Sequence, residues 1–91
     1  MKELRYTRQF KKDIKRYLNQ PGKLEELKNV LEMLRNEIPL PGKYRQHSLK
    51  GEYTGCLECH IEGDFLLIWF DEENNVIALF RLGSHSELFR N

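Results

Sequence analysis

The chain has 91 residues, of which 40% are hydrophobic and 32% charged, with a formal net charge of +1 at pH 7. This composition predicts one globular domain, residues 1–91, and excludes a disordered chain. No apolar run approaches the roughly 20 residues that span a bilayer, and the N-terminal segment lacks the apolar core of a signal peptide. We therefore expect a cytoplasmic protein with reduced cysteines.

The small net charge hides an uneven distribution of charged side chains. Residues 1–50 contain 13 Lys and Arg against 6 Asp and Glu, whereas residues 51–91 contain 2 against 8. The basic half is a candidate surface for a polyanion such as nucleic acid. An ordinary solvated helix face would account for the same charges equally well.

The first half of the chain predicts a short strand followed by two helices. Residues 2–6 alternate weakly, and Thr7 is a suitable N-cap for a helix over residues 8–19. A second helix is predicted over residues 23–37, where apolar side chains recur every three or four positions. On the first helix, apolar side chains occupy one face and cations the other: Phe10, Ile14, Tyr17 and Leu18 against Arg8, Lys11, Lys12, Lys15 and Arg16.

The last third of the chain predicts a three-stranded antiparallel meander. Three apolar runs, residues 56–61, 65–70 and 76–82, are separated by short polar segments. Gly63 supplies a positive φ for the first turn, and an Asp- and Asn-rich segment, residues 71–75, forms the second. The whole order predicts an α+β domain with two N-terminal helices packed on one face of a small antiparallel sheet.

The meander brings distant side chains to one end of the sheet. If the hairpins pair Ile61 with Phe65 and Phe70 with Val76, the first turn and the exit of the last strand lie at the same end, with His60 opposite Leu66. The side chains expected to converge there are His60, Asp64, Phe65, Arg81 and His85.

Two cysteines and a histidine form the sequence Cys56-x-x-Cys59-His60. This pattern fits covalent haem attachment, which we reject because haem is attached in this way outside the cytoplasm. On a strand the two cysteines face opposite sides, which disfavours a redox dithiol and a zinc site completed by His60 and His85. We interpret both cysteines as packing residues and expect no metal and no cofactor.

The three histidines suggest acid–base chemistry on RNA. Attack of a ribose 2′-hydroxyl on its own phosphate needs a base, an acid for the leaving 5′-oxygen, and positive charge at the phosphorane. Imidazoles can supply the base and the acid near neutral pH, and Arg81 can meet a phosphate with two parallel hydrogen bonds. An exposed Phe65 or Phe89 could stack on a base.

Three segments resemble the YafQ branch of the RelE-like toxins, the toxin halves of bacterial type II toxin–antitoxin modules. They are His47-x-Leu49-x-Gly51, the segment from Glu58 to Ile68, and the terminal RLGSHSELF, which is the most specific. The resemblance covers nearly the whole chain. It implies a RelE-like β-α-α-β-β-β fold with a short C-terminal helical turn. It also implies a ribosome-dependent mRNA endonuclease that cuts in the A site without a metal.

The resemblance further implies partners and catalytic positions. A cognate antitoxin, DNA-binding and encoded beside the toxin, would neutralise it, and the ribosome and mRNA would be its other partners. The free toxin would be a monomer and the complex a hetero-oligomer. His85 is favoured as the general acid, with His60 and Asp64 as base or orienting groups. The matched active-site positions are His47, His60, Asp64, His85 and Phe89.

The RNA-binding positions follow the family less closely. Phe65 stands where the branch often has Trp, and Leu57 where relatives usually have an Arg that could contact phosphate. Gly63 replaces a common Pro in the turn, whereas Arg81 is retained. The basic residues that would grip ribosomal RNA are Lys11, Lys12, Lys15, Arg16, Lys43, Arg45 and Lys50.

Two other functions fit the same fold. One is a catalytically weak binding module that acts through its antitoxin or the ribosome. The other is an inhibitor of DNA gyrase, as in the ParE branch of the RelE-like toxins. The histidine set argues against the gyrase inhibitor, because poisoning gyrase requires no acid–base cluster.

Overall fold

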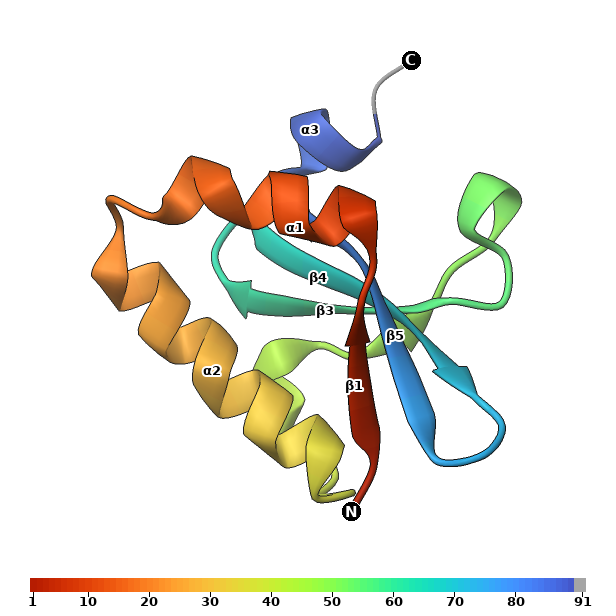
Figure 1. The fold of residues 1–91 in the computed structure, drawn as a ribbon. Coiled ribbons are helices and arrows are strands. Elements are labelled where there is room, and N and C mark those ends of the chain that lie inside the picture. Colours follow the sequence, from red (N-terminus) through yellow and green to blue (C-terminus); the bar gives the residue numbers. More distant parts are fainter. Residues whose placement is uncertain (90–91) are drawn as a thin grey trace.

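A mixed five-stranded sheet lies at the centre of the fold (Figure 1), in a computed structural model that describes residues 1–89. Three short 3₁₀ turns lie between its strands and helices: η1 (Lys15–Tyr17), η2 (Gly42–Tyr44) and η3 (Gly51–Tyr53). The strands and helices are β1 (Glu3–Tyr6), α1 (Arg8–Ile14), α2 (Pro21–Arg35), β2 (His47–Ser48), β3 (Leu57–Glu62), β4 (Phe65–Glu72), β5 (Val76–Gly83) and α3 (His85–Leu88).

The strands follow the order β1-β5-β4-β3-β2 across the sheet. Strands β2 to β5 pair antiparallel, and β1 joins the edge parallel to β5. The predicted α+β class and the meander β3-β4-β5 are confirmed. The strand β2 was not predicted, because two polar residues, His47 and Ser48, form no recognisable alternation.

Both predicted helices are present with different ends. Thr7 caps α1 as predicted, and its hydroxyl accepts a hydrogen bond from the Phe10 backbone N–H. The α-helix ends at Ile14 and tightens into η1, so the predicted continuation to residue 19 is wrong, and Leu18 is exposed. Helix α2 begins at Pro21, two residues earlier than predicted. Proline fits the first position of a helix, because its missing backbone N–H would have no partner within the helix there.

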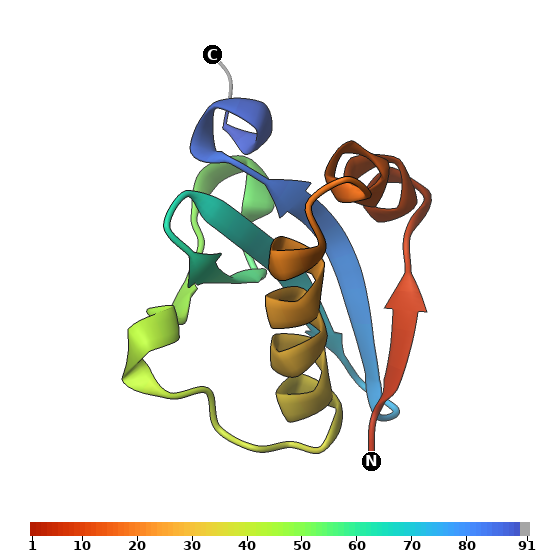
Figure 2. The same cartoon turned by 90° about the vertical axis from the view of Figure 1, so that its left-hand side faces the viewer.

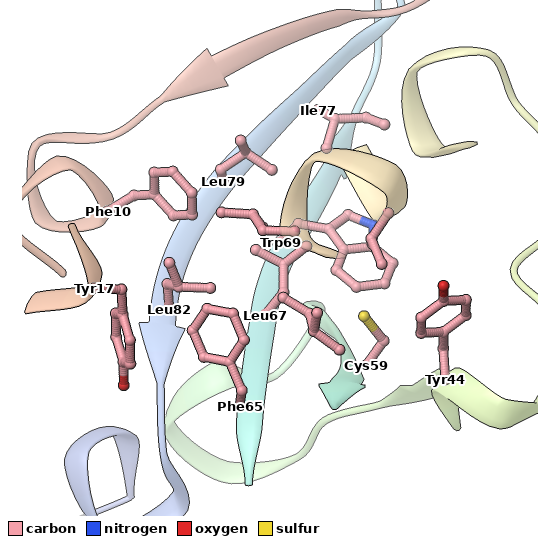
Figure 3. Close-up of a cluster of buried hydrophobic side chains, with 13 residues drawn as sticks. Phe10, Tyr17, Tyr44, Cys59, Phe65, Leu67, Trp69, Ile77, Leu79 and Leu82 are labelled. Carbon is pink, nitrogen blue, oxygen red and sulfur yellow. The ribbon is translucent and has the colours of Figure 1, made fainter. Parts of the chain in front are cut away.

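Both faces of the sheet are buried. Helices α1 and α2 cover one face, and α2 lies in front of the sheet in Figure 2. The side chains under them form the larger core, which includes Trp69 and Phe10 (Figure 3). The other face carries a smaller cluster in which Leu66 and Ile68 contact Leu88 of α3. Alternate residues of β4 therefore enter different cores, which explains its unbroken apolar sequence.

The strand register agrees with the prediction in the first hairpin and differs in the second. His60 lies opposite Leu66 as predicted, although a bulge then places Glu62, not Ile61, opposite Phe65. In the second hairpin Val76 pairs with Glu72 rather than with Phe70. The turn is shorter than predicted because Asn74 and Asn75 both adopt positive φ, which asparagine tolerates better than most residues.

The cysteines pack as predicted. Cys56 and Cys59 are free and buried, and they belong to the two different cores. Burial raises the pKa of the Cys59 thiol to about 12 and also raises the pKa of Cys56, so neither is a ready nucleophile. Within residues 1–89, no helix combines the length and apolarity needed to cross a membrane.

Candidate active site

The three imidazoles lie in a row on the sheet face opposite α1 and α2. Alternation along β3 sends Cys59 and Ile61 into the helix-side core and Glu58 and His60 to the other face. Strand β2 pairs His47 with Glu58, and α3 begins with His85 directly after β5. The ring centroids of His47 and His60 are 6.2 Å apart, and those of His60 and His85 are 5.7 Å apart. The predicted convergence of His60 and His85 is therefore confirmed.

Asp64 in the β3–β4 turn fixes the position of His85. Its Oδ1 accepts hydrogen bonds from the His85 backbone N–H at 2.9 Å and from the ring Nδ1 at 2.7 Å. The backbone donor, followed by the ring donor, lowers the pKa of Asp64. With Nδ1 donating to the carboxylate, the Nε2 of His85 is free to exchange a proton with a substrate.

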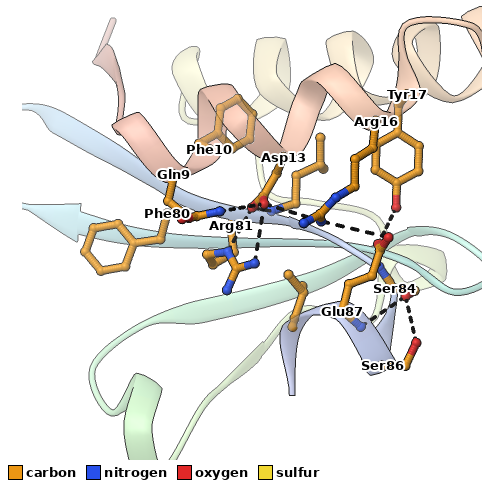
Figure 4. Close-up of polar contacts among 12 residues, drawn as sticks. Gln9, Phe10, Asp13, Arg16, Tyr17, Phe80, Arg81, Ser84, Ser86 and Glu87 are labelled. Atoms are coloured by element: carbon orange, nitrogen blue, oxygen red, sulfur yellow. Dashed lines mark hydrogen bonds and ion pairs between the residues drawn. The ribbon is translucent and has the colours of Figure 1, made fainter. Parts of the chain in front are cut away.

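A second network holds α3, and with it His85, in place. Ser84 and Glu87 form a reciprocal capping box at the start of α3. The Tyr17 hydroxyl donates to Glu87 Oε1 at 2.7 Å, and Arg16 lies 3.8 Å from Oε2 (Figure 4). The Tyr17 hydrogen bond and the Ser84 backbone N–H lower the pKa of Glu87. Residues Arg16 and Tyr17 of η1 thus hold in place the helix α3, which begins with His85.

Glu58 is a buried carboxylate among the imidazoles, and the sequence did not identify it. It is 2% exposed. Its Oε1 lies 3.1 Å from His47 Nε2 and 3.8 Å from His60 Nε2. Its Oε2 has no hydrogen-bond partner among the described residues. A signal was present, because an acid two residues before His60 on a strand must share its face.

Phe89 extends the row of rings beyond His85. The ring centroids of Phe89 and His85 are 6.0 Å apart, and Tyr53 meets Phe89 edge-on at 5.6 Å. The Tyr53 hydroxyl donates to the Leu88 carbonyl at 3.3 Å and accepts from Arg81 Nη1 at 3.1 Å. Phe89 is partly exposed beside an imidazole, where a nucleotide base could stack on it.

Arg81 is held by a buried acid rather than left free in solvent. Asp13 of α1 is fully buried and accepts from Arg81 Nε at 2.8 Å, from Nη2 at 3.3 Å and from the Leu82 backbone N–H at 3.0 Å (Figure 4). Burial alone would raise the pKa of Asp13, but these hydrogen bonds, that of Arg81 first, lower it. Asp13 was missed, although it lies on the stripe of Phe10 and Tyr17.

Phe65 corrects one expectation about the site. It is 1% exposed and lies in the helix-side core, with its ring centroid 4.7 Å from that of Tyr17. The expectation of an exposed Phe65 beside His60 is wrong, because alternation along β4 turns it under the helices. Leu57 also packs on that core, on the opposite face from His60.

The predicted basic surface is exposed but not uniform. Lys43 lies over the Tyr44 ring at 5.1 Å, and Arg16 is 3.5 Å from Asp13 as well as close to Glu87. All seven basic side chains of this predicted surface are exposed: Lys11, Lys12, Lys15, Arg16, Lys43, Arg45 and Lys50. RNA binding by these side chains stays a prediction.

One group of side chains could hold a metal ion. Glu58, His60 and His85 each offer a ligand atom within 4.8 Å of the others. Two imidazoles and one carboxylate form a ligand set typical of zinc sites that keep an open position. This set differs from the one weighed from the sequence, because the two cysteines are buried in separate cores and Glu58 takes their place.

Known proteins resemble the chain over nearly its full length. Residues 2–90 match the family model described as "Bacterial toxin of type II toxin-antitoxin system, YafQ". The mRNA interferase toxin YafQ of Escherichia coli strain K12 is 30% identical over 89 residues, which cover 97% of this chain and 96% of that protein.

Two solved structures show the same fold. A metal-bound toxin from Helicobacter pylori has a TM-score of 0.88 and 39% identity, and the match covers 98% of this chain and all 100% of that one. A chain of the E. coli DinJ-YafQ complex has a TM-score of 0.84 and 30% identity, over 98% of this chain and 99% of that one.

Proposed function

This chain belongs to the YafQ family, the toxins of bacterial type II toxin–antitoxin systems, and we propose that it is an endoribonuclease that cuts mRNA in the ribosomal A site and so inhibits translation. The similarity to an mRNA interferase supports the enzyme class. The observation that carries the proposal is the pair of neighbouring imidazoles on an open rim: the side chains of His60 and His85 are 21% and 57% exposed.

The proposed reaction is an internal transesterification. His60 takes the proton of a ribose 2′-hydroxyl, and the 2′-oxygen forms a bond to the adjacent phosphorus. The bond from phosphorus to the 5′-oxygen breaks, and Nε2 of His85 gives that oxygen a proton. The products are a 2′,3′-cyclic phosphate and a 5′-hydroxyl. Ionised Asp64 at Nδ1 stabilises the protonated form of His85 before the transfer.

The substrate would be held by stacking and by charge. Phe89 offers a partly exposed ring next to His85. The exposed lysines of the α1 region and of the segment before β2 would contact ribosomal RNA phosphates. Because such contacts release counterions, ribosome binding should weaken as salt rises. Replacing Lys11, Lys12 and Lys15 together should reduce the slope of that salt dependence.

A protein antitoxin is the proposed regulatory partner. The similar E. coli chain was solved in a DinJ-YafQ complex, described as a toxin–antitoxin complex. We propose that a cognate antitoxin binds this toxin and covers the imidazole row or the basic surface. Co-expression with the neighbouring reading frame should restore growth if that frame encodes the antitoxin.

Induced expression tests the proposed activity. Wild type should arrest growth and fragment mRNA, whereas His85→Ala should do neither. Ser86→Ala is the matched control, since it alters an exposed neighbour in the same helix and should behave as wild type. Equal arrest by wild type and His85→Ala would refute the catalytic assignment. Arrest with intact mRNA would favour the binding module, and gyrase inhibition in a supercoiling assay would favour the ParE-like function.

Metal binding is a second candidate function of the same rim. The ligand atoms of Glu58, His60 and His85 lie close enough for one divalent ion after small movements, and the similar H. pylori toxin is described as metal-bound. Such an ion would occupy the imidazoles and block proton transfer. Zinc titrated into the purified toxin should bind with a 1:1 stoichiometry by calorimetry, and His85→Ala should weaken binding at least about tenfold. Equal affinity in both proteins would exclude this site.

A further inference from the structure

The edge of the Arg81 guanidinium that suits a phosphate is already in use. Its Nε and Nη2 donate to the two carboxylate oxygens of Asp13, at 2.8 and 3.3 Å (Figure 4). Asp13 is fully buried, so this pair of hydrogen bonds is shielded from solvent. The remaining nitrogen, Nη1, donates to the Tyr53 hydroxyl at 3.1 Å. Arg81 therefore connects α1 to η3, and the edge formed by Nε and Nη2 is not free to grip a phosphate.

The two partners of the Tyr53 hydroxyl fix the direction of both of its hydrogen bonds. An arginine only donates hydrogen bonds, and a carbonyl oxygen only accepts them. The hydroxyl therefore accepts from Arg81 and gives its own proton to the Leu88 carbonyl oxygen, 3.3 Å away. Leu88 is the last residue of α3, where backbone carbonyl groups lack partners within the helix. Tyr53 thus connects the end of α3 to β5.

The ring of the same tyrosine supports Phe89. The two ring centroids are 5.6 Å apart and the ring planes meet at 86°, an edge-to-face arrangement that aromatic pairs favour. Tyr53 itself is half-buried against the smaller core. Phe89 directly follows Leu88, so one side chain contacts both the main chain and the ring at the end of α3. A helix of four residues has little stability of its own, so such contacts set its position.

We propose that Tyr53 is a positioning residue that holds the Phe89 ring beside His85, and that the pair of Arg81 and Asp13 holds Tyr53. The consequence for catalysis rests on the proposed function, in which a nucleotide base stacks on Phe89. Every base can stack through its flat face, so Tyr53 sets where the base lies rather than which base is bound. The ring centroids of Phe89 and His85 are 6.0 Å apart, so a displaced Phe89 ring would move the nucleotide away from the proton donor.

NMR of the free protein tests the positioning without RNA. In wild type, nuclear Overhauser effects should connect the rings of Tyr53 and Phe89, and their absence from the folded protein would overturn the proposal. Tyr53→Phe keeps the ring and removes the hydroxyl. The Phe89 amide, which donates to the His85 carbonyl oxygen, should then exchange its hydrogen about three- to tenfold faster.

Two comparisons separate a local effect on α3 from a general loss of stability. The amides of β4 report global unfolding, and their exchange in Tyr53→Phe should accelerate less than that of Phe89. Tyr6→Phe removes the hydroxyl of an exposed tyrosine on the edge strand β1, and it should leave exchange in α3 unchanged. Equal acceleration in α3 and β4, or no acceleration in α3, would contradict the proposed role of the hydroxyl.

A double-mutant cycle tests the consequence for cleavage. If Tyr53 acts through Phe89, Tyr53→Phe should slow mRNA cleavage about three- to tenfold in the wild-type background and have no further effect in the Phe89→Ala background. Equal slowing in both backgrounds would overturn the proposal. If wild type does not cut RNA, the nuclease proposal fails, and the NMR and exchange results still decide whether Tyr53 holds Phe89 in place.

Discussion

His85 and Asp64 lie 21 positions apart in the sequence and contact each other through two hydrogen bonds to one oxygen. One bond comes from the backbone N–H at the start of α3, and the other from the imidazole Nδ1. The β3–β4 turn is therefore fastened to both the main chain and the ring of the proposed general acid. The ring is oriented before any substrate arrives, which is the preorganisation that proton transfer requires.

Asp64→Asn should separate orientation from charge. The amide of this variant can still accept a hydrogen bond, but it no longer stabilises the protonated ring, so mRNA cleavage should fall by about 10- to 100-fold. The side chain is exposed, so the free energy of unfolding at pH 7 should stay close to that of wild type. Single-turnover cleavage and urea unfolding measure the two effects. Wild-type cleavage by this variant would show that the Asp64–His85 pair has no catalytic role.

Asp13→Asn should be strongly destabilising, because it leaves the Arg81 guanidinium partly buried without its carboxylate. Breaking a buried pair by removing one partner costs about 3–5 kcal/mol. Urea unfolding at pH 7 measures this loss, and Glu25→Gln, an exposed acid on α2, provides the control. A loss below about 1 kcal/mol would mean that the pair adds little to stability.

Tyr17→Phe should change the pH dependence of stability. At pH 7 the lost hydrogen bond to ionised Glu87 should cost about 1–2 kcal/mol. In wild type, folding lowers the pKa of Glu87 below its ordinary value of 4.5. The ionised Glu87 side chain therefore stabilises the folded state at pH values above 4.5, and this stabilisation is lost as the pH falls through the lowered pKa. The difference between the two proteins should therefore shrink in acid. A difference that stays constant down to that range would contradict the assigned role of Glu87.

Two phenylalanines predicted to stack on RNA should behave differently. Phe65→Ala removes a core side chain and should cost about 3–5 kcal/mol of stability. Phe89→Ala removes a partly exposed ring beside His85, and it should lower cleavage about tenfold with a smaller loss of stability. Thermal unfolding and cleavage of the same samples compare the two. Loss of cleavage in a fully folded Phe65→Ala protein would contradict its placement in the core.

Much of the fold could be predicted because the chain repeats apolar residues at helical and strand periods. The exceptions have physical causes. The two-residue strand β2 is too short to show a period. The β4–β5 register depends on the length of the turn between the strands. That turn is short because Asn74 and Asn75 both adopt positive φ, which the sequence alone did not show. The run containing Phe65 is apolar on both faces, so the sequence could not show which side chains meet the helices.

The candidate site could be predicted where the meander alone sets neighbours, as for His60, Asp64 and His85. The two buried acids gave a partial signal, because Asp13 lies on the apolar stripe of α1 and Glu58 lies two residues before His60 on a strand. Their partners could not be predicted, because only the fold brings Asp13 to Arg81 and Glu58 to His47.

Analysis of the product ends is the most direct test of the central claim that two imidazoles transfer protons during attack by a 2′-hydroxyl. Translating ribosomes would be supplied with wild-type toxin and an mRNA that carries either ribose or 2′-deoxyribose at the cleaved position. We predict fragments with a 5′-hydroxyl and a 2′,3′-cyclic phosphate from the ribose message, and no cleavage of the deoxy message. Fragments with a 5′-phosphate, or equal cleavage of both messages, would contradict the claim.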